Sequence, residues 1–279
     1  MTPLRLAAPA KLNLSLSVTG RRPDGYHELA SVFALLDLED WLLLLPGAPG
    51  LRIEGADEIP LGHENLAWRG LVAGLEAQPD AACLALEKLI PVAAGMGGGS
   101  SDAAAAWRLG RRWRGADEIA KAASLAVIGA DVPFFAAQLP AAYVTGIGEQ
   151  VEPLPAPEDA PHVVLAVAPF RLSTAAVFAE LRRSDWSVPP ARAAEPGRND
   201  LLAPAQRLRP EIDDLVRLMA AAGAEPHLTG SGPTLFALTD DLERAESVRA
   251  RLSAEGLRTI ATRLRRQPAS IEAIEEADR

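Results

Sequence analysis

The sequence contains a single cysteine, Cys83, among its 279 residues. One thiol cannot form an intramolecular disulfide or a thiol-rich metal site, and this usage is typical of a chain in a reducing compartment. The four histidines, His27, His63, His162 and His227, do not have the spacing of metal ligands. We therefore expect neither a disulfide scaffold nor a metal site built from protein side chains.

Long apolar runs and sustained basic tracts are also missing. The apolar stretch Leu4–Ala10 is short and is interrupted by Pro9, and no run approaches the roughly 18 apolar residues of a membrane span. The net charge is −9, and the paired arginines are too isolated to follow a nucleic-acid backbone. We expect a cytoplasmic protein, a monomer or weak homodimer, with no membrane or nucleic-acid partner.

Lysine is scarce, since Lys11, Lys88 and Lys121 stand against 25 arginines. Lysine is a compact point charge, whereas arginine is a rigid fork, so a site that needs a small cation beside a reacting oxygen would keep lysine. The alternative, that the lysines are accidental remnants of a biased composition, stays open, most of all for Lys88 and Lys121.

The most informative segment is Pro91–Ala106, in which four glycines and two serines lead into a run of alanines. Glycine lets backbone N–H groups approach a ligand, and the helix that follows directs the positive end of its dipole to the same point. The preceding Ala82–Leu86 is typical of a buried strand. We expect Ser101 or Asp102 to cap the helix, which continues toward Arg111. The segment predicts a phosphate site.

Two familiar phosphate loops do not fit this segment. A P-loop requires a Gly-Lys dipeptide, and the chain has none. A dinucleotide fingerprint would need a third glycine where Ser100 or Asp102 stands. A flexible Gly/Ser linker is the remaining alternative, but linkers do not usually join a buried strand to an alanine helix.

The first half of the chain is predicted to be rich in strands. Leu12–Val18 alternates apolar and polar residues, so Asn13, Ser15 and Ser17 are expected to share a face with Lys11. Further elements are a turn at 20–25, apolar strands at 32–36 and 41–45, helices at 64–75 and 117–128, and a helix-ending turn at 129–133.

The proline-rich segment Pro153–Pro161 is typical of an extended connector, and we predict a domain boundary there. The second half is expected to contain a strand at 162–168, a helix from 174, a Pro/Gly-rich excursion near 188–197, a helix at 211–222, then two strands, a helix and a strand. Apart from one extra helix, this is the β-α-β-β-α-β order of a ferredoxin-like unit. The charged tail after Pro268 is expected to fray.

Three segments, in their order and separation, resemble the motifs of the GHMP small-molecule kinase superfamily: Lys11–Leu14, Pro91–Ala106 and Leu228–Phe236. Other segments resemble the members that phosphorylate a cytidylated methylerythritol: Pro9–Leu14, Arg22–Glu28, Glu64–Leu66, Gly129–Phe134 and Asn199–Leu201. Ala93 and Met96 depart from a glycine and a leucine that are common in the loop.

The resemblance implies an α+β fold with two domains. Residues 1–155 would form an ATP-binding domain like domain 2 of ribosomal protein S5, and residues 156–279 a ferredoxin-like domain. It also implies transfer of phosphate from ATP, with Mg²⁺, to the 2-hydroxyl of the cytidylated methylerythritol in the non-mevalonate isoprenoid route. The implied ATP-binding residues are Asn65, Lys88, Pro91, Ala94, Gly95, Gly97, Gly98, Gly99, Ser100 and Ser101. The implied substrate-binding residues are Asn13, Tyr26, His27, Thr174, Phe178, Gly230 and Ser231.

Within this resemblance, Asp131 is the expected general base and Lys11 the cation beside it. A nearby cation keeps a carboxylate ionised and also stabilises a developing alkoxide. Mg²⁺ would be carried mainly by ATP phosphates, with help from the hydroxyl of Ser100 or Ser101, so no carboxylate cluster is expected.

From the residues alone, other interpretations remain open. Asp131 also fits a turn before Pro133, the segment at 230–232 fits a turn between strands, and Tyr26 and Phe178 fit core aromatics. At the level of function, the alternatives are a GHMP kinase for homoserine, mevalonate or a sugar, a catalytically idle nucleotide-binding regulator, and an ATP-binding module for a protein partner.

Overall fold

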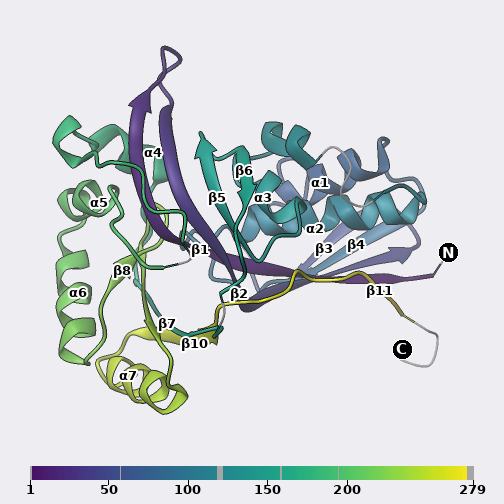
Figure 1. Ribbon diagram of the computed structural model, residues 1–279. Helices are drawn as coiled ribbons and strands as arrows, with labels where there is room; N and C mark the ends of the chain where they lie inside the picture. Colours follow the sequence, from purple (N-terminus) through teal and green to yellow (C-terminus); the bar gives the residue numbers. More distant parts are fainter. Residues whose placement is uncertain (1, 57, 118–121, 158, 194, 275–279) are drawn as a thin grey trace.

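The computed structural model describes residues 2–56, 58–117, 122–157, 159–193 and 195–274. Its two sheets are both covered by helices, which gives the mixed α+β class that the sequence predicts (Figure 1). In the first sheet the order is β11-β1-β2-β4-β3, and β5 and β6 extend from β2. In the second sheet the order is β10-β7-β9-β8.

The elements of the first sheet and its helices come mostly from the first half of the chain. The strands are β1 Leu4–Arg21, β2 His27–Pro46, β3 Gly50–Glu54, β4 Ala82–Glu87, β5 Ala141–Gly146, β6 Gln150–Pro153 and β11 Glu272–Ala273. The helices are α1 Leu66–Leu75, α2 Gly98–Trp113, the 3-10 helix η1 Ala122–Val127 and α3 Val132–Ala136.

The second sheet and its helices follow the proline-rich connector. The strands are β7 His162–Val167, β8 His227–Leu228, β9 Thr234–Thr239 and β10 Arg258–Arg263. The helices are α4 Thr174–Glu180, the 3-10 helix η2 Arg183–Asp185, α5 Leu202–Leu208, α6 Glu211–Ala221 and α7 Leu242–Ala254. Numbered within this half, the strand order is 4-1-3-2, and with two helical crossovers it confirms the ferredoxin-like prediction.

The hairpin of β1 and β2 joins the two halves, because its strands are much longer than the predicted 12–18, 32–36 and 41–45. Leu6 and Leu42 pack under α1 and α2, whereas Leu16 and Val18 belong to the core beneath α6 and α7. Leu12 and neighbouring side chains fill the space between the two sheets. A boundary at 155/156 therefore stays a prediction, since buried clusters combine side chains from both sides of it.

β-Bulges in β1 correct the predicted arrangement of its polar side chains. Register shifts occur between Pro9 and Lys11 and between Asn13 and Ser15, and each one reverses the alternation of faces. Ser17 consequently turns away from the face of Lys11 and contacts Ser187, at 2.8 Å between the hydroxyl oxygens. Alternation along a regular strand would instead place Ser17 on the same face as Lys11.

Two further expectations need correction. Residues 118–121 of the predicted helix 117–128 lie outside the described residues, and Ala122–Val127 is a 3-10 helix rather than an α-helix. The described tail is docked rather than frayed, because β11 pairs with the start of β1 and the carbonyl of Ala269 accepts a hydrogen bond from Arg108 at 2.9 Å. The 188–197 excursion ends against β1, where the amide of Gly197 donates to Leu14 at 2.9 Å. None of the helices in the described part of the chain has the length and apolar character needed to cross a membrane.

Helices α1 and α2 pack with their backbones in contact, which requires glycine at the crossing. A Cβ added at Gly70 would lie 2.0 Å from the carbonyl oxygen of Ala103, and one at Gly74 would lie 2.2 Å from that of Trp107. This contact fixes α2, and with it the glycine loop, against the rest of the first half.

We expect Gly70→Ala to lower the free energy of unfolding by about 1–3 kcal/mol, because the added methyl group must push two helix backbones apart. Helix propensity alone predicts the opposite sign, a gain of about 1 kcal/mol for alanine. Urea denaturation of both proteins measures the difference. Gly62→Ala is the control, since a Cβ there meets nothing within 4 Å. An unchanged or raised stability of Gly70→Ala would contradict the packing described.

Candidate active site

Three segments that are far apart in the sequence meet at one point of the fold. The amide of Lys11 in β1 donates to the carbonyl of Met96 at 3.0 Å, and the amide of Asn13 donates to the hydroxyl of Thr229 at 3.0 Å. Gly95 closes the third side, because a Cβ there would lie 2.7 Å from the carbonyl oxygen of Thr229. The middle of β1, the glycine loop (residues 91–99) and the turn between β8 and β9 (residues 229–233) thus form one unit.

The glycine loop ends in a helix N-terminus that carries no side-chain cap. Helix α2 begins at Gly98 after Gly97, which has a φ of +72° and contributes no capping side chain. The amides of the first turn have no partner within the helix and are available to an anion. The predicted caps are wrong: Ser101 and Asp102 lie one turn inside the helix, where both are buried. The loop is held from outside, by the bond from the Lys11 amide to Met96 and by the packing of Gly95 on Thr229, and the helix begins directly after it.

Two cavities lie on opposite sides of this helix N-terminus. One, of about 850 Å³, is lined by Lys11, Asn13, Tyr26, His27, Asp131, Phe178, Gly230 and Ser231, among others. The other, of about 540 Å³, is lined by Asn65, Lys88, Pro91, Ala94, Gly98 and Gly99, among others. We call them the acceptor cavity and the loop cavity. Both are lined by Gly95, Gly97, Ser100 and Thr174, so they adjoin at the loop.

Lys11 and Asp131 face each other in the acceptor cavity. The Nζ of Lys11 lies 3.7 Å from Oδ2 of Asp131, and the two side chains are 4% and 30% exposed. Lys11 also donates a hydrogen bond to Oδ1 of Asn13, and its Nζ lies 4.6 Å from the centre of the Phe33 ring. Burial lowers the pKa of Lys11, and the Asp131 carboxylate only partly offsets this effect. The pair therefore couples a cation held in a poorly solvated site to a carboxylate that solvent and ligand can reach.

Asp131 owes its direction to the short helix that follows it. It occupies the N-cap position of α3 without making a side-chain capping bond, and Pro133 lies in the first turn of the helix. Phe134 anchors α3 by an edge contact with Phe33, at 5.2 Å between ring centres. Gly129 lies beside Ser100, since a Cβ at 129 would be 3.5 Å from its hydroxyl oxygen. Asp131 is thus a helix-turn residue, as one interpretation held, and its carboxylate is also free to face the cavity.

In the acceptor cavity, the aromatic partner of Phe178 is His27, whereas Tyr26 lies apart from them at the rim. Phe178 of α4 stacks on His27, with 5.4 Å between ring centres and 23° between planes. Trp186 meets the edge of His27 at 6.1 Å. Burial, with a smaller contribution from Arg21, lowers the pKa of His27. Tyr26 is 61% exposed at the hairpin tip, on the rim of the same cavity.

The turn between β8 and β9 is both a structural turn and part of the cavity wall. Gly230 has a φ of +56°, and its carbonyl accepts a hydrogen bond from the Asn199 amide at 2.9 Å. The same amide group donates to the carbonyl of Leu228 at 2.8 Å. The hydroxyls of Ser231 and Thr174 lie 2.8 Å apart, which connects this turn to α4. Asn199, which was not among the expected site residues, holds the turn in place.

Several expected nucleotide contacts have their polar atoms engaged within the protein. Oδ1 of Asn65 caps α1 by accepting from the amide of Ala67 at 2.8 Å, and its amide group donates to Pro60 at 2.8 Å. Lys88 is paired with Asp40 and with Asp102, the latter at 2.7 Å. Sequence reasoning missed Asp40, which is fully buried in β2; the signal in the sequence is an acid that directly precedes the apolar run at 41–45.

Ser101 is not brought into either cavity. Its hydroxyl is buried without a partner and lines a small interior space of about 20 Å³ between β1 and α2. Ser100 is the serine that faces both the acceptor cavity and the loop cavity. Lys121 lies outside the described residues.

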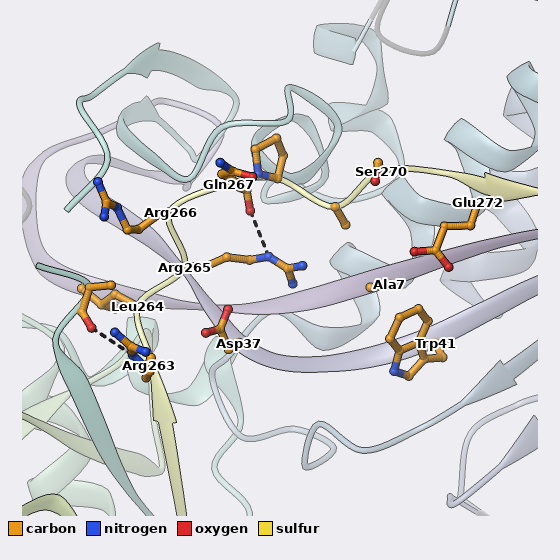
Figure 2. A pocket seen from close by; sticks show the side chains of 13 residues that line it. Ala7, Asp37, Trp41, Arg263, Leu264, Arg265, Arg266, Gln267, Ser270 and Glu272 are labelled. Carbon is orange, nitrogen blue, oxygen red and sulfur yellow. Dashed lines mark hydrogen bonds between the residues drawn. The ribbon is translucent and has the colours of Figure 1, made fainter. Parts of the chain in front are cut away.

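Another cavity, of about 460 Å³, lies where the segment after β10 crosses β1 and β2 (Figure 2). Two of the three arginines that line it are engaged: Arg265 pairs with Glu39, and Arg263 donates to the carbonyl of Ala160 at 3.3 Å. Figure 2 also shows Arg266 pointing away from Arg265. None of the expected site residues lines this cavity.

Two family models match the chain, GHMP kinases N terminal domain over residues 65–138 and GHMP kinases C terminal over residues 177–257. The chain is 41% identical over 266 residues to the 4-diphosphocytidyl-2-C-methyl-D-erythritol kinase of Paracoccus denitrificans, with 89% of this chain and 92% of the relative covered. It is 40% identical over 264 residues to the kinase of the same name from Thermus thermophilus, covering 90% and 91% of the two chains.

Solved structures give the same picture. A crystal structure of 4-(cytidine 5'-diphospho)-2C-methyl-D-erythritol kinase matches with a TM-score of 0.81 at 37% identity, covering 93% of this chain and 98% of the other. A homoserine kinase from Cytophaga hutchinsonii matches with a TM-score of 0.67 at 14% identity, covering 98% of each chain, which is a likeness of fold alone. Sequence and fold agree that the chain belongs to the 4-diphosphocytidyl-2-C-methyl-D-erythritol kinase family of GHMP kinases.

Proposed function

We propose that the chain transfers the γ-phosphoryl group of ATP to the 2-hydroxyl of 4-diphosphocytidyl-2-C-methyl-D-erythritol. The names of its relatives support this substrate. The single observation that carries the proposal is the meeting of two cavities at an uncapped helix N-terminus, with Lys11 and Asp131 facing each other on one side of it. Such an arrangement suits a donor and an acceptor that approach a common point.

The loop cavity is proposed to hold ATP. Amides of the first turn of α2 would bind its phosphates, because they lack intrahelical partners and lie at the positive end of the helix dipole. The γ-phosphate would lie at the border of the two cavities, beside Gly97 and Ser100. Phosphoryl transfer has a loose transition state, so positioning and charge stabilisation are the main contributions that a protein makes.

The residues at this border fit a Mg²⁺ ion that is held mainly by phosphate oxygens. Ser100 lines both cavities and Asp131 lines the acceptor cavity, whereas the described residues contain no cluster of three acidic, histidine or cysteine side chains that could hold a metal ion. When bound, Mg²⁺ neutralises the charge that develops on the transferred group.

Asp131 is proposed to accept the proton of the attacking hydroxyl, and Lys11 to stabilise the alkoxide that develops. A carboxylate with 30% of its side chain exposed can reach a substrate hydroxyl, and a cation 3.7 Å away keeps the carboxylate ionised. Because burial lowers the pKa of Lys11, its ammonium group is a good hydrogen-bond donor to an oxyanion. Asn13 orients the ammonium group by accepting one of its hydrogen bonds.

The cytosine of the acceptor is proposed to stack on the aromatic layer of His27 and Phe178, with Tyr26 closing over it from the hairpin tip. His27 and Phe178 are already in mutual contact, so a base would add to this stack rather than separate it. Binding energy at this remote end would position the reacting hydroxyl beside Asp131.

Asp131→Asn and Lys11→Met should each lower kcat by about 100-fold or more, because proton acceptance or charge stabilisation is lost while the side-chain volume is nearly kept. The double variant should be little worse than either single variant. Steady-state rates of ADP formation test this, together with calorimetric ATP binding, which should change little. Asp37→Asn, an exposed acid outside both cavities, is the control. Near-normal kcat in both single variants would contradict the assignment.

Gly99→Val should weaken ATP binding by about tenfold or more, because branched methyl groups would crowd the backbone where phosphate approaches. Gly99 is the best position for this test, since a Cβ there meets only Leu66, at 3.3 Å, whereas one at Gly98 would press on Lys88. Calorimetry with a non-hydrolysable ATP analogue gives the affinity. Gly50→Val, at an open position, should bind ATP normally. Equal ATP affinity in folded Gly99→Val and wild type would exclude the loop as the phosphate site.

Phe178→Ala should weaken binding of the cytidylated acceptor by about 1–3 kcal/mol and leave ATP affinity unchanged, because a stacking surface is lost on the acceptor side only. Phe170→Ala provides a matched control, as Phe170 stacks under Arg209 and lines neither cavity. In parallel, methylerythritol phosphate without the cytidine should be a very poor substrate. Comparable kcat/KM for the uncytidylated compound, homoserine or mevalonate would disprove the substrate assignment.

A further inference from the structure

Directly beneath the first turn of α2 lies a buried cluster of three ionisable groups, one lysine between two acids. Lys88 pairs with Asp40 and with Asp102, the latter at 2.7 Å, and the three side chains are 0% to 4% exposed. A Cβ at Gly98 would lie 3.3 Å from Nζ of Lys88, and Lys88 and Asp102 line the loop cavity, which puts the cluster beside the proposed phosphate site. The proposed mechanism uses none of these groups.

The cluster ties together three elements that set the position of the loop. Asp40 belongs to β2, Lys88 follows β4, and Asp102 lies in α2. Besides Lys88, Asp40 accepts hydrogen bonds from two consecutive backbone amides, those of Leu89 at 2.6 Å and Ile90 at 2.8 Å. These contacts fix the chain where it enters the glycine loop. Glycines cannot hold the loop by side-chain packing, so its rigidity must come from such neighbours.

The charge of the cluster does not balance if both acids are ionised. Two carboxylates and one ammonium then leave one net negative charge, buried, behind amides that would receive a polyanion. A buried uncompensated charge is costly, and two carboxylates in contact normally share a proton. Oδ1 of Asp102 is buried and accepts no hydrogen bond. An ionised carboxylate would need donors at both oxygens, so this environment favours the protonated acid. The charged groups that act on Asp102 are Lys88, which favours its ionised form, and Asp40, which opposes it.

We propose that Asp40, Lys88 and Asp102 form a positioning cluster that holds the phosphate-binding turn and stays electrically neutral by keeping one proton between the two acids, so that loss of this proton weakens ATP binding. This inference rests on the proposed function, because it takes the first turn of α2 as the ATP phosphate site. None of the three lines the acceptor cavity, where Lys11 and Asp131 meet. They act through the loop and through the charge behind it.

The direction of the expected pH dependence follows from the titration of the acid pair. Burial raises the pKa of Asp102 to about 8, with a further contribution from the Asp40 carboxylate and opposition from Lys88. Burial lowers the pKa of Lys88, but Asp102 and Asp40 outweigh it and raise that pKa, so Lys88 remains charged. ATP, an anion, favours the protonated pair. Affinity for ATP is therefore full below the pKa of the pair and falls as the pH rises through it.

The test measures the calorimetric Kd of a non-hydrolysable ATP analogue with Mg²⁺ between pH 6.5 and pH 9 for the full chain. In wild type, Kd should rise about tenfold across this range, the effect of about one unit charge at several ångströms in a partly solvated site. Asp102→Asn imitates the protonated acid, so its Kd should stay within about threefold of the wild-type value at low pH and should not rise. Asp40→Asn should also remove the rise, which keeps the test valid if one variant fails to fold.

Glu39→Gln is the matched control, because it removes a partly buried ion pair with Arg265 from the neighbouring position of β2. In Glu39→Gln, Kd should depend on pH as it does in wild type, even if the protein is less stable. The control thus separates a loss of stability from a change in the titration of the cluster. A rise that persists in Asp102→Asn belongs to another group, such as Lys11, and overturns the inference, as does a flat wild-type profile. If wild type binds no ATP at any pH, the proposed function fails and this inference fails with it.

Discussion

Close contact between two backbone turns is the constraint on which the candidate site depends. Gly95 in the glycine loop lies against the carbonyls of Thr229 and Gly232, and Gly230 lies against the carbonyl of Gly95. No side chain fits at these positions, so the two turns approach as bare backbone. Because one turn belongs to the first half of the chain and the other to the second, this contact also sets where the two halves meet. The cavities on either side of the loop follow from it.

Two buried lysines lie near this contact, and each has a different set of charged neighbours. Lys11 is buried beside one partly exposed carboxylate, and its pKa is lowered. Lys88 is buried between two carboxylates, and its pKa is raised. Lys11 thus faces the acceptor cavity beside a single carboxylate, whereas the charge of Lys88 is neutralised by its two neighbours within the protein. Scarcity of lysine pointed to both positions, but only their neighbours distinguish them.

Much of the architecture could be predicted from local pattern. The buried strand before the glycine loop, the helix after it and the β-α-β-β-α-β order of the second half all rest on periodicity and on glycine and proline, which act over a few residues. The resemblance of the motifs to known kinases supplied Lys11 and Asp131. Prediction failed where distant contacts decide: the cap of α2, the 3-10 helix near 122–127 and the docked tail at 269–274. Each depends on backbone partners that no local pattern specifies.

By itself, the sequence determined that the chain forms an α+β kinase fold, that its glycine loop joins a strand to a helix, and that few residues can carry chemistry. These properties follow from local propensity and from motif spacing along the chain. Only the tertiary structure decided which face each polar side chain takes, because bulges in β1 reverse the alternation after Asn13. It also paired Phe178 with His27 and enclosed Lys88 between Asp40 and Asp102. Such pairings join residues far apart in the sequence, so packing between the two halves and across the first sheet selects them.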